Sequence, residues 1–147
     1  MRILALDHGT VRIGVAVSDE LGLLAHPLDF LPAEPVNAFL DRLKGLIHER
    51  EVSLILVGMP RNMDGSYGPS AQKVQAFVHL LKETIPIPIR TWDERLTSTQ
   101  AHRMLAETGK RERDRRGKVD SSAAAVLLQS YLDAASAGGE LGGPLGP

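Results

Sequence analysis

The sequence predicts a single α/β domain in which a mixed five-stranded sheet is flanked by helices. Two short apolar runs separated by a turn open the chain, and a continuous apolar run later lies between two amphipathic segments. Strand-like and helix-like patterns then alternate toward the C-terminus, which is typical of parallel α/β units. The 147 residues suffice for one domain with a proper core and are too few for two ordinary domains.

Three antiparallel strands are predicted first. Arg2 to Asp7 and Ile13 to Ser18 are short apolar runs, and Gly9 marks a turn between them, which predicts a β-hairpin. Leu23 to Leu31 is predicted to add a third antiparallel strand, which Pro32 and Pro35 then end.

The pattern then changes to helical spacing. Apolar residues three and four positions apart predict an amphipathic helix from Pro35 to about Arg50. Val52 to Val57 is apolar apart from Ser53 and ends at Gly58, which predicts a central strand buried on both faces. A second helix is predicted to begin at Pro69.

The last predicted strand follows Pro86 to Ile89, since prolines hold the backbone extended on the way into Thr91 and Trp92. Helices are predicted for Thr97 to Glu107 and for Val119 to Ala137. We expect one domain over residues 1–137 and a disordered tail rich in Gly and Pro over residues 138–147.

Composition excludes several classes of site. The chain has no cysteine, so disulfides, thiolate metal sites and cysteine nucleophiles are excluded. The first residues do not form a signal peptide, and no apolar stretch approaches the ~20 residues of a membrane span, so we expect a cytoplasmic protein. The net charge of −1 gives no information about partners.

Three carboxylates are the candidate catalytic and metal-binding residues. Asp7 closes the first predicted strand before a turn, and Glu94 follows the last one, where ligands collect in sheets of this kind. Each also has a simpler interpretation, in which Asp7 caps the turn and Glu94 lies in a solvated loop or opens a helix.

Asp120 is the most informative of the three. Helical spacing places it with Ala123, Ala124, Leu127 and Tyr131, the stripe expected to face the sheet, and an acid there is costly unless it is neutralised. A helix N-terminus would also stabilise it without any ligand.

Together these acids predict a site for Mg²⁺ or Mn²⁺. Hard divalent ions prefer oxygen ligands and keep waters available for substrate phosphates. Two such ions ~4 Å apart activate a water and stabilise the leaving oxygen of a phosphodiester. This interpretation predicts hydrolysis of nucleic acid without a side-chain nucleophile.

Basic and amide side chains are the candidate phosphate contacts, because arginine forks match phosphate oxygens and clustered charges attract the backbone. For any one of them, surface solvation is the alternative. The helix N-terminus at Pro69 could also accept an anion. The candidates are Arg12, Arg61, Asn62 and Arg95, together with Lys110, Arg111, Arg115, Arg116 and Lys118 of one short basic segment.

Four blocks of the chain together resemble the YqgF family: LALDHGTVRIGVAVSD, VGMPRNMDGSYGPSAQKVQAF, WDERLTSTQAHRML and KVDSSAAAVLLQSYLD. Members are described as pre-16S ribosomal RNA nucleases and as Holliday junction resolvase-like proteins. The resemblance covers residues 1–135 and implies the ribonuclease H-like fold. It also assigns the acids of three blocks to Asp7, Glu94 and Asp120, and it suggests Arg12 and the loop from Asn62 to Gly65 as parts of the site.

The resemblance implies that the protein trims the 5′ end of precursor 16S rRNA, with pre-ribosomal particles as partners, or that it cleaves branched DNA as a resolvase-like endonuclease. A monomer is expected, because nothing in the sequence demonstrates an interface, although symmetric junction cleavage would favour a dimer. Two other classes are weighed. A phosphotransferase is suggested by Asp-x-Gly before a hairpin, although one domain supplies only half of its cleft, and a non-catalytic nucleic-acid-binding factor would use the basic segment alone.

Overall fold

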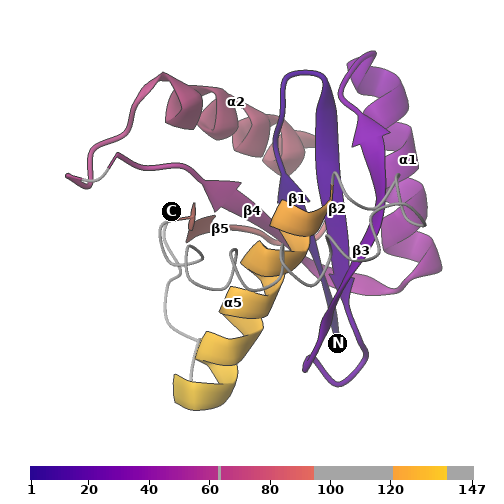
Figure 1. The fold of residues 1–147 in the computed structure, drawn as a ribbon. Helices are drawn as coiled ribbons and strands as arrows, with labels where there is room; N and C mark the ends of the chain where they lie inside the picture. Colours follow the sequence, from indigo (N-terminus) through magenta and orange to yellow (C-terminus); the bar gives the residue numbers. More distant parts are fainter. Residues whose placement is uncertain (63, 95–120, 139–147) are drawn as a thin grey trace, which may run out of the picture.

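The computed structural model describes residues 1–62, 64–94 and 121–138 (Figure 1). Five strands and three helices are described there. In chain order they are β1 (Arg2–Asp7), β2 (Arg12–Ser18), β3 (Ala25–Pro32), α1 (Val36–Glu49), β4 (Val52–Met59), α2 (Pro69–Thr84), β5 (Ile89–Asp93) and α5 (Ser122–Gly138).

The strands form one mixed sheet in the order β3-β2-β1-β4-β5. β1, β2 and β3 pair antiparallel, whereas β4 pairs parallel with both β1 and β5. Because β1, β4 and β5 run in the same direction, their carboxyl ends meet at one edge of the sheet. This is the edge where ligands gather in sheets of this kind.

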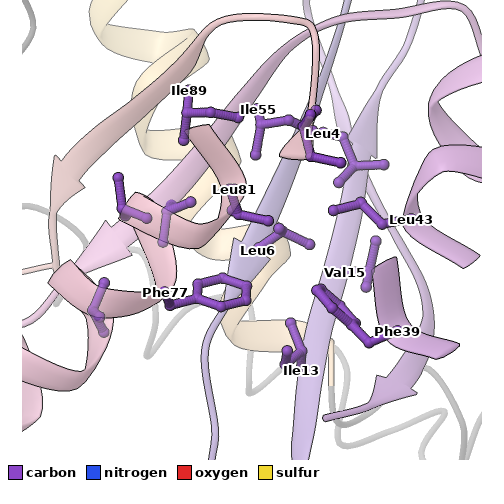
Figure 2. Packing of buried hydrophobic residues seen from close by; sticks show 14 of the residues in the cluster. Leu4, Leu6, Ile13, Val15, Phe39, Leu43, Ile55, Phe77, Leu81 and Ile89 are labelled. Carbon is purple, nitrogen blue, oxygen red and sulfur yellow. The ribbon is translucent and has the colours of Figure 1, made fainter. Parts of the chain in front are cut away.

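Helices cover both faces of the sheet because the central strands bury side chains on both sides. Leu4 and Leu6 of β1 point into a core formed with α1 and α2, where Phe39 and Phe77 lie near each other (Figure 2). Ala5 points into the opposite core, formed with α5. The small residues Ala124 and Ala125 are fully buried there, so α5 packs closely on β1 and β2.

The predicted five-stranded mixed sheet with helices on both faces is confirmed. β3 begins at Ala25 rather than Leu23, because residues 19–24 form a turn closed by hydrogen bonds to Asp19. The described part of α5 begins at Ser122 and ends at Gly138. The predicted helix over residues 97–107 and the tail over residues 139–147 lie outside the described residues.

One prediction about α5 is wrong. Ala123 is exposed rather than part of the stripe facing the sheet. Ala124, Leu127 and Tyr131 are buried against the sheet as predicted, and the same buried face also includes Ala125, Leu128 and Leu132. No helix within the described residues is long and apolar enough to cross a membrane.

Candidate active site

Asp7 and Glu94 lie together at the carboxyl edge of the sheet. Asp7 ends β1 and Glu94 follows β5, with β4 between the two strands. The two carboxyl groups are hydrogen-bonded to each other and half-buried. Residues 87 positions apart in the chain are thus brought into contact by parallel strands that end at the same level.

Gly58 of β4 makes this contact possible. A Cβ atom at Gly58 would lie 2.9 Å from Glu94 Oε1 and 3.2 Å from Leu127 Cδ2 of α5. Both distances are shorter than ordinary van der Waals contacts between such atoms. The absence of a side chain at position 58 therefore lets Glu94 reach across β4 while α5 packs against the same strand.

The environment of the two acids favours their uncharged forms. Burial raises the pKa of Asp7, although its hydrogen bond with Glu94 acts in the opposite direction. Burial raises the pKa of Glu94 to about 7, with further contributions from the charge of Asp7, the hydrogen bond to Asp7 and the charge of Asp93. The pair therefore holds a proton near neutral pH when no cation is present.

A pocket of about 360 Å³ opens directly beside the two carboxyl groups. Its lining comes from the β1–β2 turn, the end of β4, the first turns of α2 and Glu94. The turn is tight, since a Cβ atom at Gly9 would lie 2.4 Å from the Arg12 carbonyl oxygen. Polar lining residues include Asp7, Glu94, His8, Thr10, Ser70 and Lys73.

His8 lies in this pocket with its ring 4.6 Å from the ring of Phe77, measured between centroids. Burial lowers the pKa of His8, the charge of Asp7 raises it, and the charge of Lys73 lowers it. The imidazole is therefore neutral at neutral pH, so it can accept or donate a hydrogen bond toward a ligand.

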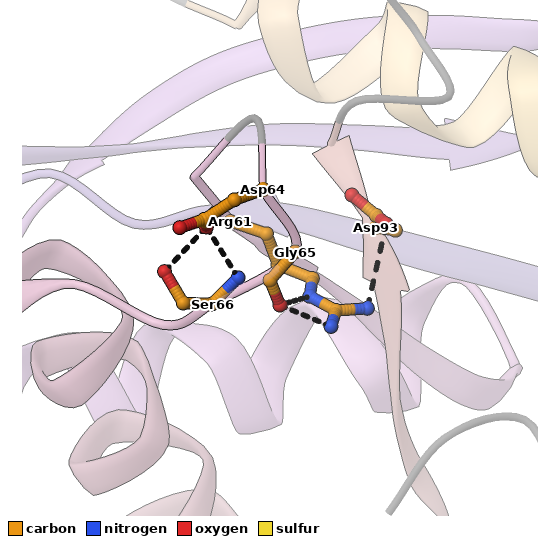
Figure 3. A network of polar contacts seen from close by, with 5 residues as sticks. All are labelled: Arg61, Asp64, Gly65, Ser66 and Asp93. Carbon is orange, nitrogen blue, oxygen red and sulfur yellow. Dashed lines mark hydrogen bonds and ion pairs between the residues drawn. The ribbon is translucent and has the colours of Figure 1, made fainter.

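Arg61 is held inside its own loop (Figure 3). Its Nε and Nη2 atoms donate hydrogen bonds to the Gly65 carbonyl oxygen, and Nη1 lies 3.8 Å from Asp93 Oδ2. Its guanidinium also lies over the ring of Tyr67, 4.6 Å from the centroid. These contacts involve all three guanidinium nitrogens. Arg61, which the sequence suggests as a phosphate contact, therefore stabilises the loop in this structure.

The other predicted phosphate contacts are distributed differently. Arg12 lies at the same edge of the sheet as Asp7, with its guanidinium 5.2 Å from the ring centroid of Phe30. Asn62 donates a side-chain hydrogen bond to Ser66 Oγ within the loop before α2. Neither residue lines the pocket beside the acids. Outside the described residues lie Arg95, Lys110, Arg111, Arg115, Arg116 and Lys118.

Asp120, the third predicted carboxylate, also lies outside the described residues. Among the described residues, no group of three acidic or histidine side chains is placed to hold a metal ion. The residue next to Asp120 is described: the Ser121 hydroxyl accepts a hydrogen bond of 2.9 Å from the Val15 backbone N–H. Val15 pairs with Leu6, which directly precedes Asp7.

Sequence reasoning missed two residues of this site, Gly58 and Lys73. The sequence predicts Gly58 only as the end of a strand, because its proximity to Glu94 depends on strands distant in sequence. Lys73 has a local signal, since it lies three residues after Ser70 and four before Phe77, on one side of a predicted helix. What that side faces is decided by tertiary packing.

The fold is shared with solved resolvases. RuvC from Thermus thermophilus, solved in complex with a Holliday junction substrate, superposes with a TM-score of 0.57 at 17% identity, covering 94% of this chain and 97% of that one. The fowlpox virus resolvase with its junction DNA gives a TM-score of 0.51 at 10% identity, covering 91% and 98%. These likenesses confirm the predicted ribonuclease H-like fold.

Bacterial relatives match at higher identity. A protein of Halothermothrix orenii named "Putative pre-16S rRNA nuclease" is 44% identical over 133 residues, which cover 90% of this chain and 95% of that protein. A protein of the same name from Geobacillus kaustophilus is 46% identical over 135 residues, covering 90% and 98%. The model of the RuvX family, described as Holliday junction resolvase, matches residues 1–134. The family predicted from the four sequence blocks is confirmed, and the chain belongs to the RuvX family.

Proposed function

We propose that this chain is a divalent-metal-dependent nuclease that hydrolyses phosphodiester bonds with Asp7, Glu94 and Asp120 as its metal-binding carboxylates. The observation that carries the proposal is the pair of half-buried, hydrogen-bonded carboxyl groups beside an open pocket. Folding does not favour such a pair by itself, because burial and mutual repulsion both oppose its ionisation. A bound cation would remove that cost.

The donor set fits Mg²⁺ or Mn²⁺. Asp7 and Glu94 offer only oxygen atoms, and these hard ions coordinate carboxylates together with water and substrate phosphate. Ser121 follows Asp120 in the chain, and its hydroxyl accepts a hydrogen bond from Val15 of β2, which pairs with Leu6 near the end of β1. This position of Ser121 supports Asp120 as the third carboxylate. The cation, when bound, would supply Lewis acidity and a water of lowered pKa.

The chain's own residues would position the reaction. The carboxylates would hold the cation at the sheet edge, and the pocket would receive the scissile phosphate beside them. Gly58 keeps the Glu94 side chain within reach of Asp7. His8, uncharged and fixed against Phe77, can hydrogen-bond a substrate oxygen or a water at the pocket wall.

The proposed substrate is the 5′-extended precursor of 16S rRNA, processed by a monomer in the cytoplasm on pre-ribosomal particles. Relatives that align with 90% of this chain are named as pre-16S rRNA nucleases, and this supports the RNA substrate. A four-way DNA junction is the second candidate, because the family description and the RuvC complex both concern Holliday junctions. The carboxylate pair serves either polymer, since it acts on the phosphodiester that both share.

The test measures cleavage of a 5′-extended 16S precursor RNA and of a four-way DNA junction in Mg²⁺ or Mn²⁺. Asp7→Asn is compared with the native protein, and Asp41→Asn, an exposed position on α1, is the matched control. We expect precursor cleavage that Asp7→Asn lowers at least about 1000-fold and Asp41→Asn leaves unchanged. Junction cleavage alone would favour the resolvase. Cleavage of neither substrate would refute the nuclease and favour the binding factor.

A further inference from the structure

The pocket beside the carboxylates has a second wall, which carries a positively charged side chain. Ser70, Lys73 and Val74 of α2 line it, at positions that share one side of a helix. Phe77, one turn after Lys73, contacts the ring of His8, so this side of α2 faces the β1–β2 turn that directly follows Asp7. A cationic side chain and two carboxyl groups thus border the same space.

Lys73 has no polar contact within the described residues that would fix its side chain. Its side chain is exposed, and it forms no hydrogen bond or ion pair with another described residue. The residues one helical turn away on either side are Pro69, Ser70, Ala76 and Phe77, none of them acidic. Lys73 therefore shares a pocket with Asp7 and Glu94 without pairing with either acid.

We infer that Lys73 binds a non-bridging phosphate oxygen of the nucleic-acid backbone at this pocket, opposite the metal-binding carboxylates. The inference rests on the proposed function for its substrate class. A lysine ammonium is a compact charge with three donors, suited to phosphate oxygens approached from different directions. It would compensate the phosphate charge on the side away from the cation, while the acids bind the cation rather than the lysine.

The surroundings of Lys73 fit the same ligand. α2 has no side-chain cap at its N-terminus and no acid in its first turn, so nothing there offsets the positive end of its dipole. The Ser70 hydroxyl adds a neutral donor on the same wall. An anion entering the pocket would therefore meet favourable charge from α2.

The experiment measures binding separately from cleavage. Fluorescein-labelled 5′-extended 16S precursor RNA and a labelled four-way DNA junction are titrated with the full chain in Ca²⁺, from about 50 to 200 mM KCl. The variants are Lys73→Ala, Lys73→Arg and, as matched control, Lys44→Ala at an exposed position of α1. Thermal melts of each variant report folding.

For Lys73→Ala we expect a Kd increase of about tenfold or more on the nucleic acid that binds, with the slope of log Kd against log salt reduced by about 1. Lys73→Arg should restore most of both quantities, and Lys44→Ala should change neither. Unchanged Kd and salt slope in a folded Lys73→Ala would overturn the inference even if the native protein cleaves. Weakened binding without any cleavage by the native protein would uphold the phosphate contact and refute the hydrolysis.

Discussion

The loop from Arg61 to Tyr67 and the pocket beside Asp7 both carry charged residues. The charges are paired with oppositely charged or polar partners in the loop, whereas in the pocket two acids face each other. In the loop, Arg61 is matched by the Gly65 carbonyl, Asp93 and the Tyr67 ring, and Asp64 Oδ1 accepts hydrogen bonds from the Ser66 backbone N–H and hydroxyl. In the pocket, Asp7 faces another acid, and Lys73 pairs with neither.

This difference distinguishes polar groups that stabilise the fold from polar groups that are available to a ligand, within the described part of the molecule. Polar groups that satisfy one another hold a loop in shape and need no ligand. Carboxyl groups that raise one another's pKa are unfavourable until a cation joins them. The four predictions below test this division, from the largest expected effect to the smallest.

Gly58→Ala should lower nuclease activity about 100-fold. The added Cβ would lie 2.9 Å from Glu94 Oε1, and the flexible glutamate gives way more easily than the backbone. A misplaced metal ligand loses rate steeply, because positioning supplies much of the catalysis. Single-turnover cleavage measures this effect.

Gly45→Ala is the control for that substitution. Its Cβ would meet no atom within 4 Å, and alanine is favoured over glycine in a helix. It should leave cleavage unchanged. Equal activity of the Gly58 and Gly45 variants would show that the position of Glu94 does not matter.

Affinity for Mn²⁺ should rise about tenfold between pH 6 and pH 8. Glu94, with its pKa raised to about 7, is mostly protonated below that pH and mostly ionised above it. The cation must displace the proton, so binding weakens as the pH falls. Calorimetric titration at several pH values measures the effect, and Glu94→Gln should abolish the dependence. A flat profile in the native protein would contradict the raised pKa.

Arg61→Gln should destabilise the protein by about 1–2 kcal/mol while changing cleavage less than threefold. The substitution removes two charge-assisted hydrogen bonds and the contact with Tyr67, but the side chain is partly exposed and solvent weakens its ion pair. Urea unfolding and cleavage assays measure the two effects. Arg42→Gln, exposed on α1, is the control. A large loss of cleavage with normal stability would make Arg61 a substrate contact.

Asp7→Asn should stabilise the cation-free protein by about 1 kcal/mol at pH 8, or about 3 °C in Tm, after allowance for solvent screening. The pKa of Glu94 is raised in the folded state from 4.5 to about 7, so the folded state binds more protons across that window. Stability of the cation-free native protein therefore falls as the pH rises through it. At pH 4 the two proteins should melt alike. A lower Tm for the variant at pH 8 would show that the pair is not repulsive.

Much of the fold could be predicted because local patterns are strong in this chain. The run from Val52 to Val57 is apolar apart from Ser53 and predicts the buried strand β4, and Pro69 begins α2 as its position at the first helical turn suggests. Helical spacing identified the side of α5 that faces the sheet, since Ala124, Leu127 and Tyr131 are buried, but it does not say how wide the buried face is, and Ala123 is exposed. Asp7 and Glu94 were recognised individually from their positions at strand ends.

By itself, the sequence determined the order of strands and helices, the two acids at strand ends and the family, because these depend on residue types and spacing along the chain. Only the tertiary structure decided that Glu94 reaches Asp7 past Gly58, that Arg61 is bound by its own loop, and that Lys73 borders the acids. These are contacts between segments far apart in the chain or between a loop and its neighbouring strand. Their energies depend on distance and burial, which no local pattern encodes.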